Sequence, residues 1–355
     1  MKAYINGIGA LAPQLTLEDD QFLDQIENYD TNRLQIIKIN YRDYIDPKVL
    51  RRMSKIVRMS MVSAKVALAD ASLENADAII TGTGMGCQID TEKFLNALLE
   101  NNESMLNPTA FIQSTHNTMG AQIALMNGNN NYNLTFVHRT FSFESALLDS
   151  LMMLNENEVK NILLGGIDEI TEESWLIKTR IGFFKKNALN NLGLLDDKQT
   201  GALAGESVGF FVLSKNITEN TYAEIAATST FFKPGSIEEI EARIKQFLQE
   251  NKLDPASLDL AILGYNGDSA FDKIYHTLEQ SIFNTTSIAY YKHLCGEHDT
   301  SSAFAMWIAA KILKSGHIPP IVLKEKSNID QPQNILIYNQ FRNTNHSLIL
   351  LRKPE

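Results

Sequence analysis

The feature of this sequence that most constrains its fold is an alternation of short apolar runs with longer amphipathic segments. The apolar runs predict β-strands at 2–8, 78–81, 134–137, 161–164 and 210–213. Between them, apolar residues recur every three or four positions over 48–72 and 142–154, a spacing that predicts helices. Strands that alternate with helices in this way are typical of layered α/β folds.

The same alternation starts again in the second part of the chain. It predicts strands at 223–228 and 258–264, helices at 237–250 and 300–313, and a closing hairpin at 335–338 and 347–351. No proline- or serine-rich linker separates the two parts. The simplest interpretation is one compact unit of two similar α/β halves, residues 1–214 and 215–355.

Charge and composition narrow the class of protein. The chain of 355 residues has 32 Lys+Arg against 42 Asp+Glu, a net charge of −10, which leaves no basic surplus for sequence-independent nucleic-acid binding. Its start shows no signal-peptide pattern, and the most apolar run, 303–310, is too short to span a membrane. The only two cysteines, Cys87 and Cys295, cannot form a disulfide scaffold, so we expect a cytoplasmic protein. Any catalytic thiol must be one of these two.

Motifs that bind nucleotides or metals are incomplete. The run Gly7-Ile8-Gly9-Ala10-Leu11-Ala12 matches a dinucleotide fingerprint, but Pro13 follows and no helical pattern begins there, so we expect a tight turn. His293 and His298 flank Cys295 without a second ligand pair, and no G-x-S-x-G nucleophile elbow occurs. We therefore expect neither a cofactor nor a metal.

Several separated segments together resemble the β-ketoacyl synthase family. They are Ile5-Asn6-Gly7-Ile8-Gly9, Leu50-Arg51-Arg52-Met53, the segment 107–117, Gly165-Gly166-Ile167-Asp168-Glu169, Gly205-Glu206-Ser207-Val208-Gly209 and Gly316-His317-Ile318-Pro319-Pro320. They follow the order of the family over essentially the whole chain. The resemblance implies a thiolase fold, in which two βαβαβαββ-like halves stack into a five-layer αβαβα sandwich. It also implies that two subunits pair across a continuous sheet.

Active members of this family extend acyl chains on acyl carrier protein (ACP) by decarboxylating a malonyl unit. The resemblance implies a catalytic cysteine at a strand-to-helix turn, two histidines that stabilise the enolate, a lysine and a glycine-rich loop. Here Thr140 aligns with the cysteine, and shifts of one or two residues offer only Phe141 or Ser142. A threonine hydroxyl is protonated at neutral pH and needs an adjacent base, so we interpret Thr140 as a packing or helix-capping residue.

The other catalytic positions have changed as well. Asn266 stands where the resemblance places the first histidine and Glu297 where it places the second, although Lys292 of the same motif is kept. An amide could still donate a hydrogen bond to an oxyanion, whereas an ionised carboxylate would repel an enolate. His298 is one position late, so a local slip offers a substitute. In Phe341-Arg342-Asn343-Thr344-Asn345, larger residues replace two glycines of the family, and we expect the loop to lose backbone freedom.

The chain keeps the family's structural motifs but has other residues at the catalytic positions. In this it is similar to chain length factors, which are ketosynthase-like subunits that lack the nucleophile and pair with a competent ketosynthase. It is similar in particular to those of bacterial type II polyketide systems for aryl polyene and flexirubin-type pigments. The resemblance implies that residues at the shared interface shape the acyl tunnel. The candidates for that role are Phe111, His116, Asn117, Phe141 and Phe341.

Two alternatives stay open. The chain could be a divergent ketosynthase or acyltransferase that uses Cys295, Cys87 or Ser142 as its nucleophile, or a scaffold homodimer without a polyketide role. Because ACPs are acidic and this chain carries a net charge of −10, we expect ACP to dock mainly on the catalytic partner. One cationic stretch is interpreted as the solvated face of a helix: Lys48, Arg51, Arg52, Lys55 and Arg58.

Overall fold

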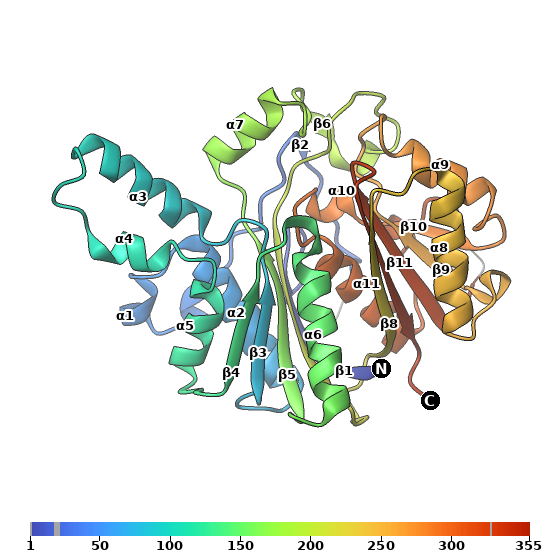
Figure 1. Cartoon of the computed structure of the whole chain (residues 1–355), viewed down its shortest axis with the longest axis horizontal. Helices are drawn as coiled ribbons and strands as arrows, with labels where there is room; N and C mark the ends of the chain where they lie inside the picture. Colours follow the sequence, from blue (N-terminus) through green and yellow to red (C-terminus); the bar gives the residue numbers. More distant parts are fainter. Residues whose placement is uncertain (1, 18–21, 327–328) are drawn as a thin grey trace.

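The computed structural model describes residues 2–17, 22–326 and 329–355. Within these residues, a 10-stranded sheet has the order β10-β9-β11-β12-β8-β1-β7-β5-β3-β4 (Figure 1). Its strands are β1 (Ala3–Leu11), β3 (Ala78–Gly82), β4 (Tyr132–Phe136), β5 (Asn161–Asp168), β7 (Ser207–Ser214), β8 (Ala223–Phe232), β9 (Leu260–Leu263), β10 (Ser287–Tyr290), β11 (Asn334–Phe341) and β12 (Asn345–Arg352). A separate small ladder joins β2 (Asp30–Thr31) to β6 (Leu189–Asn190).

The large sheet consists of two sets of strands with the same topology. In the first set, β1 and β5 both run antiparallel to β7, while β5, β3 and β4 are parallel. In the second set, β8 and β11 both run antiparallel to β12, while β11, β9 and β10 are parallel. The sets join where Tyr4 of β1 pairs antiparallel with Glu224 of β8. The chain therefore repeats one βαβαβαββ pattern. The division between residues 214 and 215 stays a prediction, which the end of β7 at Ser214 supports.

Helices complete five layers around three apolar cores. α6 (Ser142–Glu156) and α11 (Ser302–Ser315) lie between the two sets of strands, and they share one core with the inner faces of both sets. α2 (Lys55–Asp70) and α5 (Thr118–Met126) cover the outer face of the first set. On the outer face of the second set lie α8 (Ile237–Glu250) and α9 (Lys273–Gln280). This arrangement confirms the predicted α/β sandwich of thiolase type.

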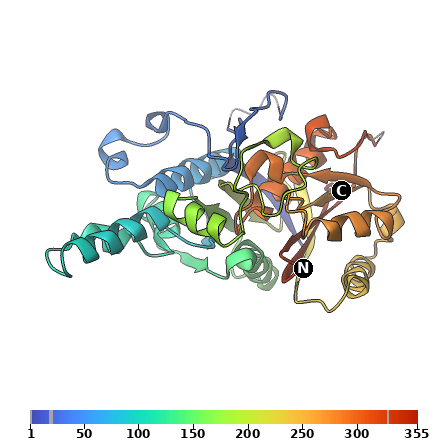
Figure 2. The same ribbon diagram turned by 90° about the horizontal axis from the view of Figure 1, so that it is seen from above.

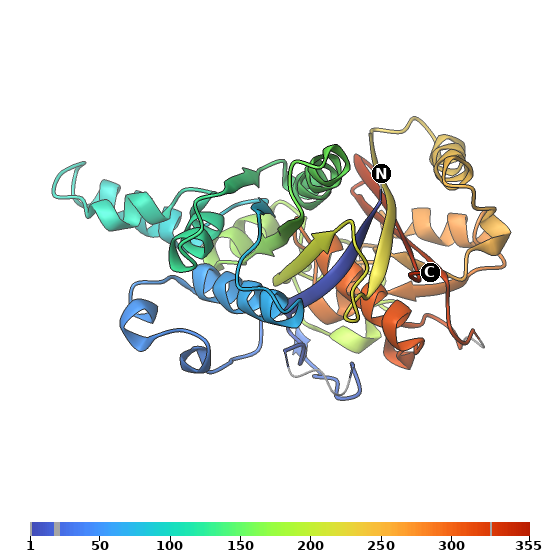
Figure 3. The same cartoon turned by 90° about the horizontal axis from the view of Figure 1, so that it is seen from below.

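The glycines of the apparent nucleotide motif lie inside strand β1, which continues to Leu11, so the expected tight turn is wrong. A Cβ atom on Gly7 would lie 2.3 Å from the carbonyl oxygen of Ala67, and one on Gly9 would lie 2.2 Å from that of Ser63. Both carbonyls belong to α2, which packs directly on β1 (Figure 3). Glycine is needed here because helix and strand approach closely, and a phosphate has no part in it.

The single long helix predicted over 48–72 is in fact two helices. α1 (Pro47–Leu50) is short, and α2 begins only at Lys55, after Ser54 takes an extended backbone (φ −69°, ψ 169°) as its N-cap. Between the helices, Met53 is buried. Apolar spacing does not detect this break, because a capping serine and a buried methionine both fit a continuous helical pattern.

A helical hairpin projects from the body beyond the edge strand β4. It consists of α3 (Gln88–Glu100) and α4 (Pro108–Gln113), and it extends away from the sheet in both views (Figures 1 and 2). Two further helices follow strand ends near the polar residues described below, α7 (Glu172–Arg180) and the short α10 (Lys292–Cys295). Within the described residues, no helix is long and apolar enough to cross a bilayer.

Candidate functional site

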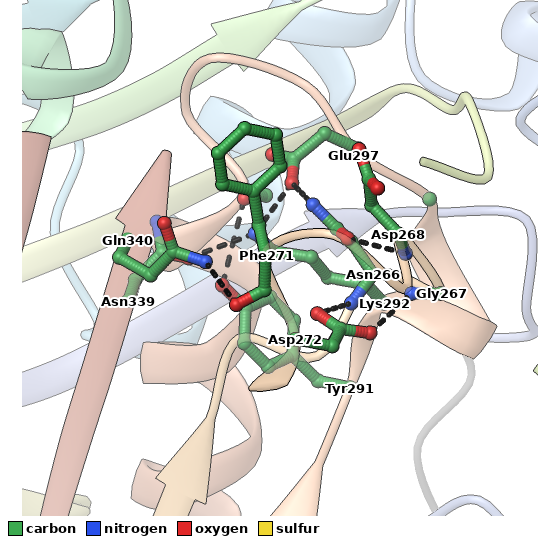
Figure 4. A network of polar contacts seen from close by, with 12 residues as sticks. Asn266, Gly267, Asp268, Phe271, Asp272, Tyr291, Lys292, Glu297, Asn339 and Gln340 are labelled. Carbon is green, nitrogen blue, oxygen red and sulfur yellow. Dashed lines mark hydrogen bonds and ion pairs between the residues drawn. The ribbon is translucent and has the colours of Figure 1, made fainter. Parts of the chain in front are cut away.

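The carboxyl ends of three parallel strands bring together polar residues of the second half. Asn266 follows β9, Lys292 opens α10 after β10, and Asn339 lies near the end of β11. Because β10, β9 and β11 are adjacent and parallel, their ends meet at one edge of the sheet, where α/β folds commonly place their sites. Figure 4 shows these side chains converging with that of Glu297, which follows α10.

Glu297 is the centre of this network. Its Oε2 accepts a hydrogen bond from Asn266 Nδ2 at 2.6 Å and another from Lys292 Nζ at 2.8 Å. Lys292 Nζ also donates to Asn339 Oδ1 at 2.8 Å. Lys292 is 0% exposed and Glu297 4% exposed, so the ion pair is shielded from water. Both donors are therefore already committed to a carboxylate of the chain itself, and charge-assisted bonds of this length are strong.

The amide of Asn266 is held in one orientation. Its Oδ1 accepts a hydrogen bond from the Asp268 backbone N–H at 3.0 Å, which leaves Nδ2 to face Glu297. Asp272 accepts hydrogen bonds from the backbone N–H groups of Asn266 and Gly267, at 3.2 and 2.8 Å, and so fixes the loop. Burial raises the pKa of Asp272 to about 7, and these two bonds limit the rise.

Thr140 lies in a tight turn before α6, at the position that the resemblance assigns to the nucleophile. The turn is a single 3-10 turn, Arg139–Phe141, and Thr140 is buried. Ser142 stabilises it, because its hydroxyl donates to the Arg139 carbonyl at 2.6 Å and accepts from the His138 N–H at 2.8 Å. The Ser142 hydroxyl is therefore a structural group of the turn and is itself fully buried.

Sequence reasoning missed Glu144, which lies one turn further along α6. Its side chain is 1% exposed, and among the described residues no group forms a hydrogen bond of good geometry with either carboxylate oxygen. Burial raises its pKa, while Ser302, Ser347 and the charge of Lys292 act in the opposite direction. The charge of Lys292 therefore acts on Glu144 in the first turn of α6. The only signal in the sequence is a lone acid on a helix face that is otherwise apolar.

Neither cysteine is suited to nucleophilic attack. Cys87 and Cys295 are both 0% exposed. Burial raises the pKa of each thiol above its usual range, so both are protonated at neutral pH. Cys87 Sγ contacts Met119 Sδ at 3.1 Å, and Cys295 Sγ faces the Gly296 carbonyl. Both thiols therefore act as buried packing groups.

His298 does not take the place of the missing histidine. Its Nε2 lies 2.7 Å from Ser207 Oγ on β7, so the ring is engaged with the first half of the molecule. Burial lowers the pKa of His298 to about 3, which keeps the ring neutral. Glu297 is fixed independently, because its backbone N–H donates to the Leu203 carbonyl at 2.7 Å.

The turn between β11 and β12 keeps the backbone shape that the lost glycines favour. Arg342 and Asn343 have φ values of 50° and 53°, both in the left-handed region, and the Thr344 N–H donates to the Phe341 carbonyl at 3.0 Å. The replacement of glycine has therefore not changed this backbone conformation, and the expected loss of backbone freedom stays a prediction. Asparagine tolerates this region, whereas an arginine there needs support from tertiary contacts.

The predicted interface and tunnel residues divide into two groups. Phe111 is 57% exposed, and His116 and Asn117 are exposed too, on the side of the molecule where α4 and α5 lie. Phe141 is buried, and Phe341 is half-buried against Phe183 with ring centroids 5.9 Å apart. The structure therefore does not bring the five together on one surface, and their roles stay predictions.

The space beside Glu297 is small. A cavity of about 20 Å³ is lined by Glu169, Lys178, Glu297 and His298, among others. That volume suffices for one water molecule and is far too small for an acyl group. In the part of the chain that the structure describes, no group of three or more His, Cys, Asp or Glu residues has the geometry of a metal site.

Comparison with known proteins identifies the class of fold. Residues 34–179 match the model of the β-ketoacyl synthase N-terminal domain. That segment includes Thr140 and ends before Asn266, Lys292 and Glu297. No match was found among curated protein sequences.

Solved structures share the fold over the full chain. The ishigamide ketosynthase/chain length factor matches with a TM-score of 0.81 at 16% identity and covers 100% of this chain and 99% of that chain. A β-ketoacyl synthase from Burkholderia phymatum STM815 matches at 0.79 and 14% identity, with 100% of both chains covered. AntDE:AntF, a type II PKS acyl-carrier protein in complex with its ketosynthase bound to the hexaketide, matches at 0.74 and 13%, over 99% of each chain. The chain therefore has the thiolase-type fold of ketosynthases.

Proposed function

We propose that this protein is a non-catalytic, ketosynthase-like subunit, a chain length factor. It pairs with an active β-ketoacyl-ACP synthase in type II polyketide or fatty-acid-like chain elongation and shapes the acyl tunnel. One observation carries the proposal. At the positions that the resemblance assigns to the two catalytic histidines, this chain has Asn266 and Glu297, which form a buried network with Lys292.

The chemistry of condensation does not fit this network. Decarboxylation of a malonyl unit leaves an enolate, which needs hydrogen-bond donors that are free to meet it. Here Asn266 and Lys292 already donate to Glu297, and the carboxylate of Glu297 would repel a second anion. The divergent-enzyme alternative also lacks a nucleophile, because Cys87, Cys295 and Ser142 are all buried.

An unpaired sheet edge supports the assignment of a protein partner. In the part of the chain that the structure describes, β4 is the last strand of the sheet and pairs with β3 alone. Tyr132 and Leu134 on this strand are 43% and 38% exposed. Exposed edge strands with apolar side chains are templates for pairing with another chain. Further exposed apolar residues lie on neighbouring elements: Phe111, Ile112, Leu125, Met126, Val137, Leu148 and Met152.

A basic lobe offers a secondary contact for an acidic carrier protein. Residues 38–65 contain eight cationic and two acidic side chains, although the whole chain has a net charge of −10. The expectation of one solvated helix face needs correction, because Arg51 and Arg52 lie exposed between α1 and α2, and Lys55 pairs with the buried Glu206. The main docking site of the carrier stays assigned to the catalytic partner, and this lobe would add to it electrostatically.

Pairing is tested by co-expression with a cysteine-bearing ketosynthase of the same gene neighbourhood. We expect a stable 1:1 heterodimer, and we expect products whose chain length changes when interface residues of this chain are altered. Leu134→Asp on β4 should abolish co-purification, because it places a charge in the paired edge. Ile217→Asp is a matched control, since Ile217 is 48% exposed but lies far along the chain in the link between β7 and β8.

Three results would overturn the proposal. The first is that the two chains purify separately. The second is that the chain length of the product does not change when this chain is altered. The third is a stable acyl adduct on this chain, detected by intact mass after incubation with acyl-ACP. The last result would instead establish the divergent-enzyme alternative. A pigment of the aryl polyene or flexirubin type is the product class that we propose, and extraction of pigment from a deletion strain tests it.

A further inference from the structure

Arg342, in the turn between β11 and β12, contacts aromatic rings from both halves of the molecule. The guanidinium carbon of Arg342 lies 4.5 Å from the ring centroid of Phe183 and 4.8 Å from that of Phe271. Phe183 belongs to the loop after α7 in the first half, and Phe271 to the loop after β9 in the second half. Arg342 Nη1 also donates to the Gly182 carbonyl at 3.3 Å. A guanidinium over two aromatic faces is attracted by both rings.

Neighbouring contacts hold the same turn in place. Phe341 packs edge-on against Phe183. Gln340 Oε1 accepts a hydrogen bond from the Asn343 N–H at 2.8 Å, and the Lys233 N–H donates to the Thr344 carbonyl at 2.7 Å. Arg342 keeps a left-handed φ of 50°, which is a strained conformation for a non-glycine residue. Such strain persists because the surrounding contacts over-determine the conformation.

This fastened turn lies beside the polar network. Asn339, which accepts a hydrogen bond from Lys292, is on the same strand end as Arg342. Phe271 immediately precedes Asp272, whose carboxylate holds the Asn266 loop. Figure 4 shows Phe271 and Gln340 next to Asn266 and Lys292, and Gln340 Nε2 lies 3.5 Å from the Phe271 carbonyl. In Figure 1 the turn is at the same end of the molecule as α7.

We propose that Arg342 keeps this turn closed over the degenerate site, so that the subunit excludes a thioester-linked acyl arm from its own site. The inference rests on the proposed function, in which the acyl chain is loaded and extended in the partner subunit. Arg342 contacts loops of both halves, and it stands at a position where the resemblance implies glycine. Arg342 is thus a positioning residue, which acts through Phe183 and Phe271.

A reporter thiol at the degenerate site tests this closure. Thr140 is the buried position that the resemblance assigns to the nucleophile, four residues before Glu144, so the Thr140→Cys variant places the reporter thiol there. It is compared with the double variant T140C/R342G, because glycine accepts the φ of 50° without strain. Each protein is treated with iodoacetyl-pantetheine, and peptide mapping separates the new thiol from Cys87 and Cys295.

We expect the reporter thiol to react at least tenfold faster with the pantetheine probe when Arg342 is replaced. The labelling rate with the small reagent iodoacetamide should rise less than the rate with the pantetheine probe. A closed turn excludes the larger reagent more strongly, whereas a general loss of structure would speed up labelling by both reagents. T140C/R33A is the matched control, since Arg33 makes the same kind of contact, 4.9 Å over the Trp175 ring, and pairs with Glu172, and both of these partners lie on α7 and not in the β11–β12 turn. Its labelling rate should equal that of T140C.

Hydrogen exchange gives a second readout that needs no reporter. In R342G, amides of 266–272 and 339–345 should exchange at least tenfold faster than in the unmodified chain, with R33A unchanged. Equal pantetheine labelling in the two T140C proteins, or unchanged exchange, would overturn the closure. These measurements use the chain alone. If the chain does not pair with a ketosynthase, the proposed function is refuted but the closure by Arg342 is not. If the labelling and exchange rates do not change, the closure is refuted but the proposed function is not.

Discussion

Removing one partner of the Lys292–Glu297 pair should cause a large loss in the free energy of unfolding. In Lys292→Met the carboxylate of Glu297 stays buried without its cation, and in Glu297→Leu the ammonium of Lys292 stays buried without its anion. Both groups are at most 4% exposed, so water cannot compensate. Breaking a buried pair by removing one partner costs about 3–5 kcal/mol. We expect each single variant to lose that much free energy of unfolding.

The double variant K292M/E297L should cost much less than the sum of the two. It leaves no buried charge, but Asn266 Nδ2 and Asn339 Oδ1 lose their partners. An unsatisfied buried polar group costs about 1–3 kcal/mol, so the double variant should lose about 2–6 kcal/mol. With the middle of each range, about 8 kcal/mol for the two single variants together and about 4 kcal/mol for the double variant, a double-mutant cycle should give a coupling of about 4 kcal/mol.

Equilibrium denaturation followed by tryptophan fluorescence measures these values. The exposed pair Arg243–Glu239 on α8, 3.5 Å apart with side chains 53% and 43% exposed, is the matched control. The variant R243M should cost no more than about 0.5 kcal/mol, and Glu239 is left unchanged because its carboxylate also accepts a hydrogen bond from the Gly235 N–H at the start of α8. Single losses below about 1 kcal/mol at Lys292 and Glu297, or additive losses, would refute the reasoning that the pair is a desolvated unit.

Two further predictions concern packing and pH. Gly9→Ala should destabilise the fold by about 3 kcal/mol, the upper end of the usual cost of overpacking, because the new Cβ would lie 2.2 Å from the Ser63 carbonyl oxygen. Gly193→Ala is the control and should be nearly neutral in thermal denaturation, because its new Cβ would meet nothing within 4 Å. Asp272, with its pKa raised from 3.8 to about 7, binds a proton in the folded chain that the unfolded chain has lost, so its stabilising contribution is complete below about pH 4 and is lost as pH rises to about 7. The stability of the unmodified chain relative to D272N should therefore fall by up to about 4 kcal/mol across that range. Identical pH profiles for the two proteins would contradict the shift.

The sequence determined the layered fold because its evidence is local and repeated. Apolar runs with strand length and segments with helical spacing alternate twice along the chain, and they do so whatever the partners of each element are. Motif order then predicted the thiolase-type sandwich, which the repeated topology confirms. The exceptions are local too. The break before Lys55 depends on an extended Ser54, and the continuation of β1 through Gly7 and Gly9 accompanies the close packing of α2 on these two glycines.

The sequence also singled out Asn266, Lys292 and Glu297, but only by comparison with the motifs of the family that the chain resembles. That Glu297 receives both donors, and that Asn339 completes the network, depends on the parallel order of β10, β9 and β11. These partners are separated along the chain by as many as 47 residues, so no sequence period encodes their contact.

Tertiary structure alone decided which side chains are available for chemistry. The sequence offered two thiols and a serine as possible nucleophiles, and burial removed all three. It indicated a turn without glycine, and contacts of Arg342 with rings from both halves kept that turn in the glycine conformation. Residue identity sets what a group can do in water. Whether the group meets water, a charge or an aromatic face is fixed only when distant segments pack together.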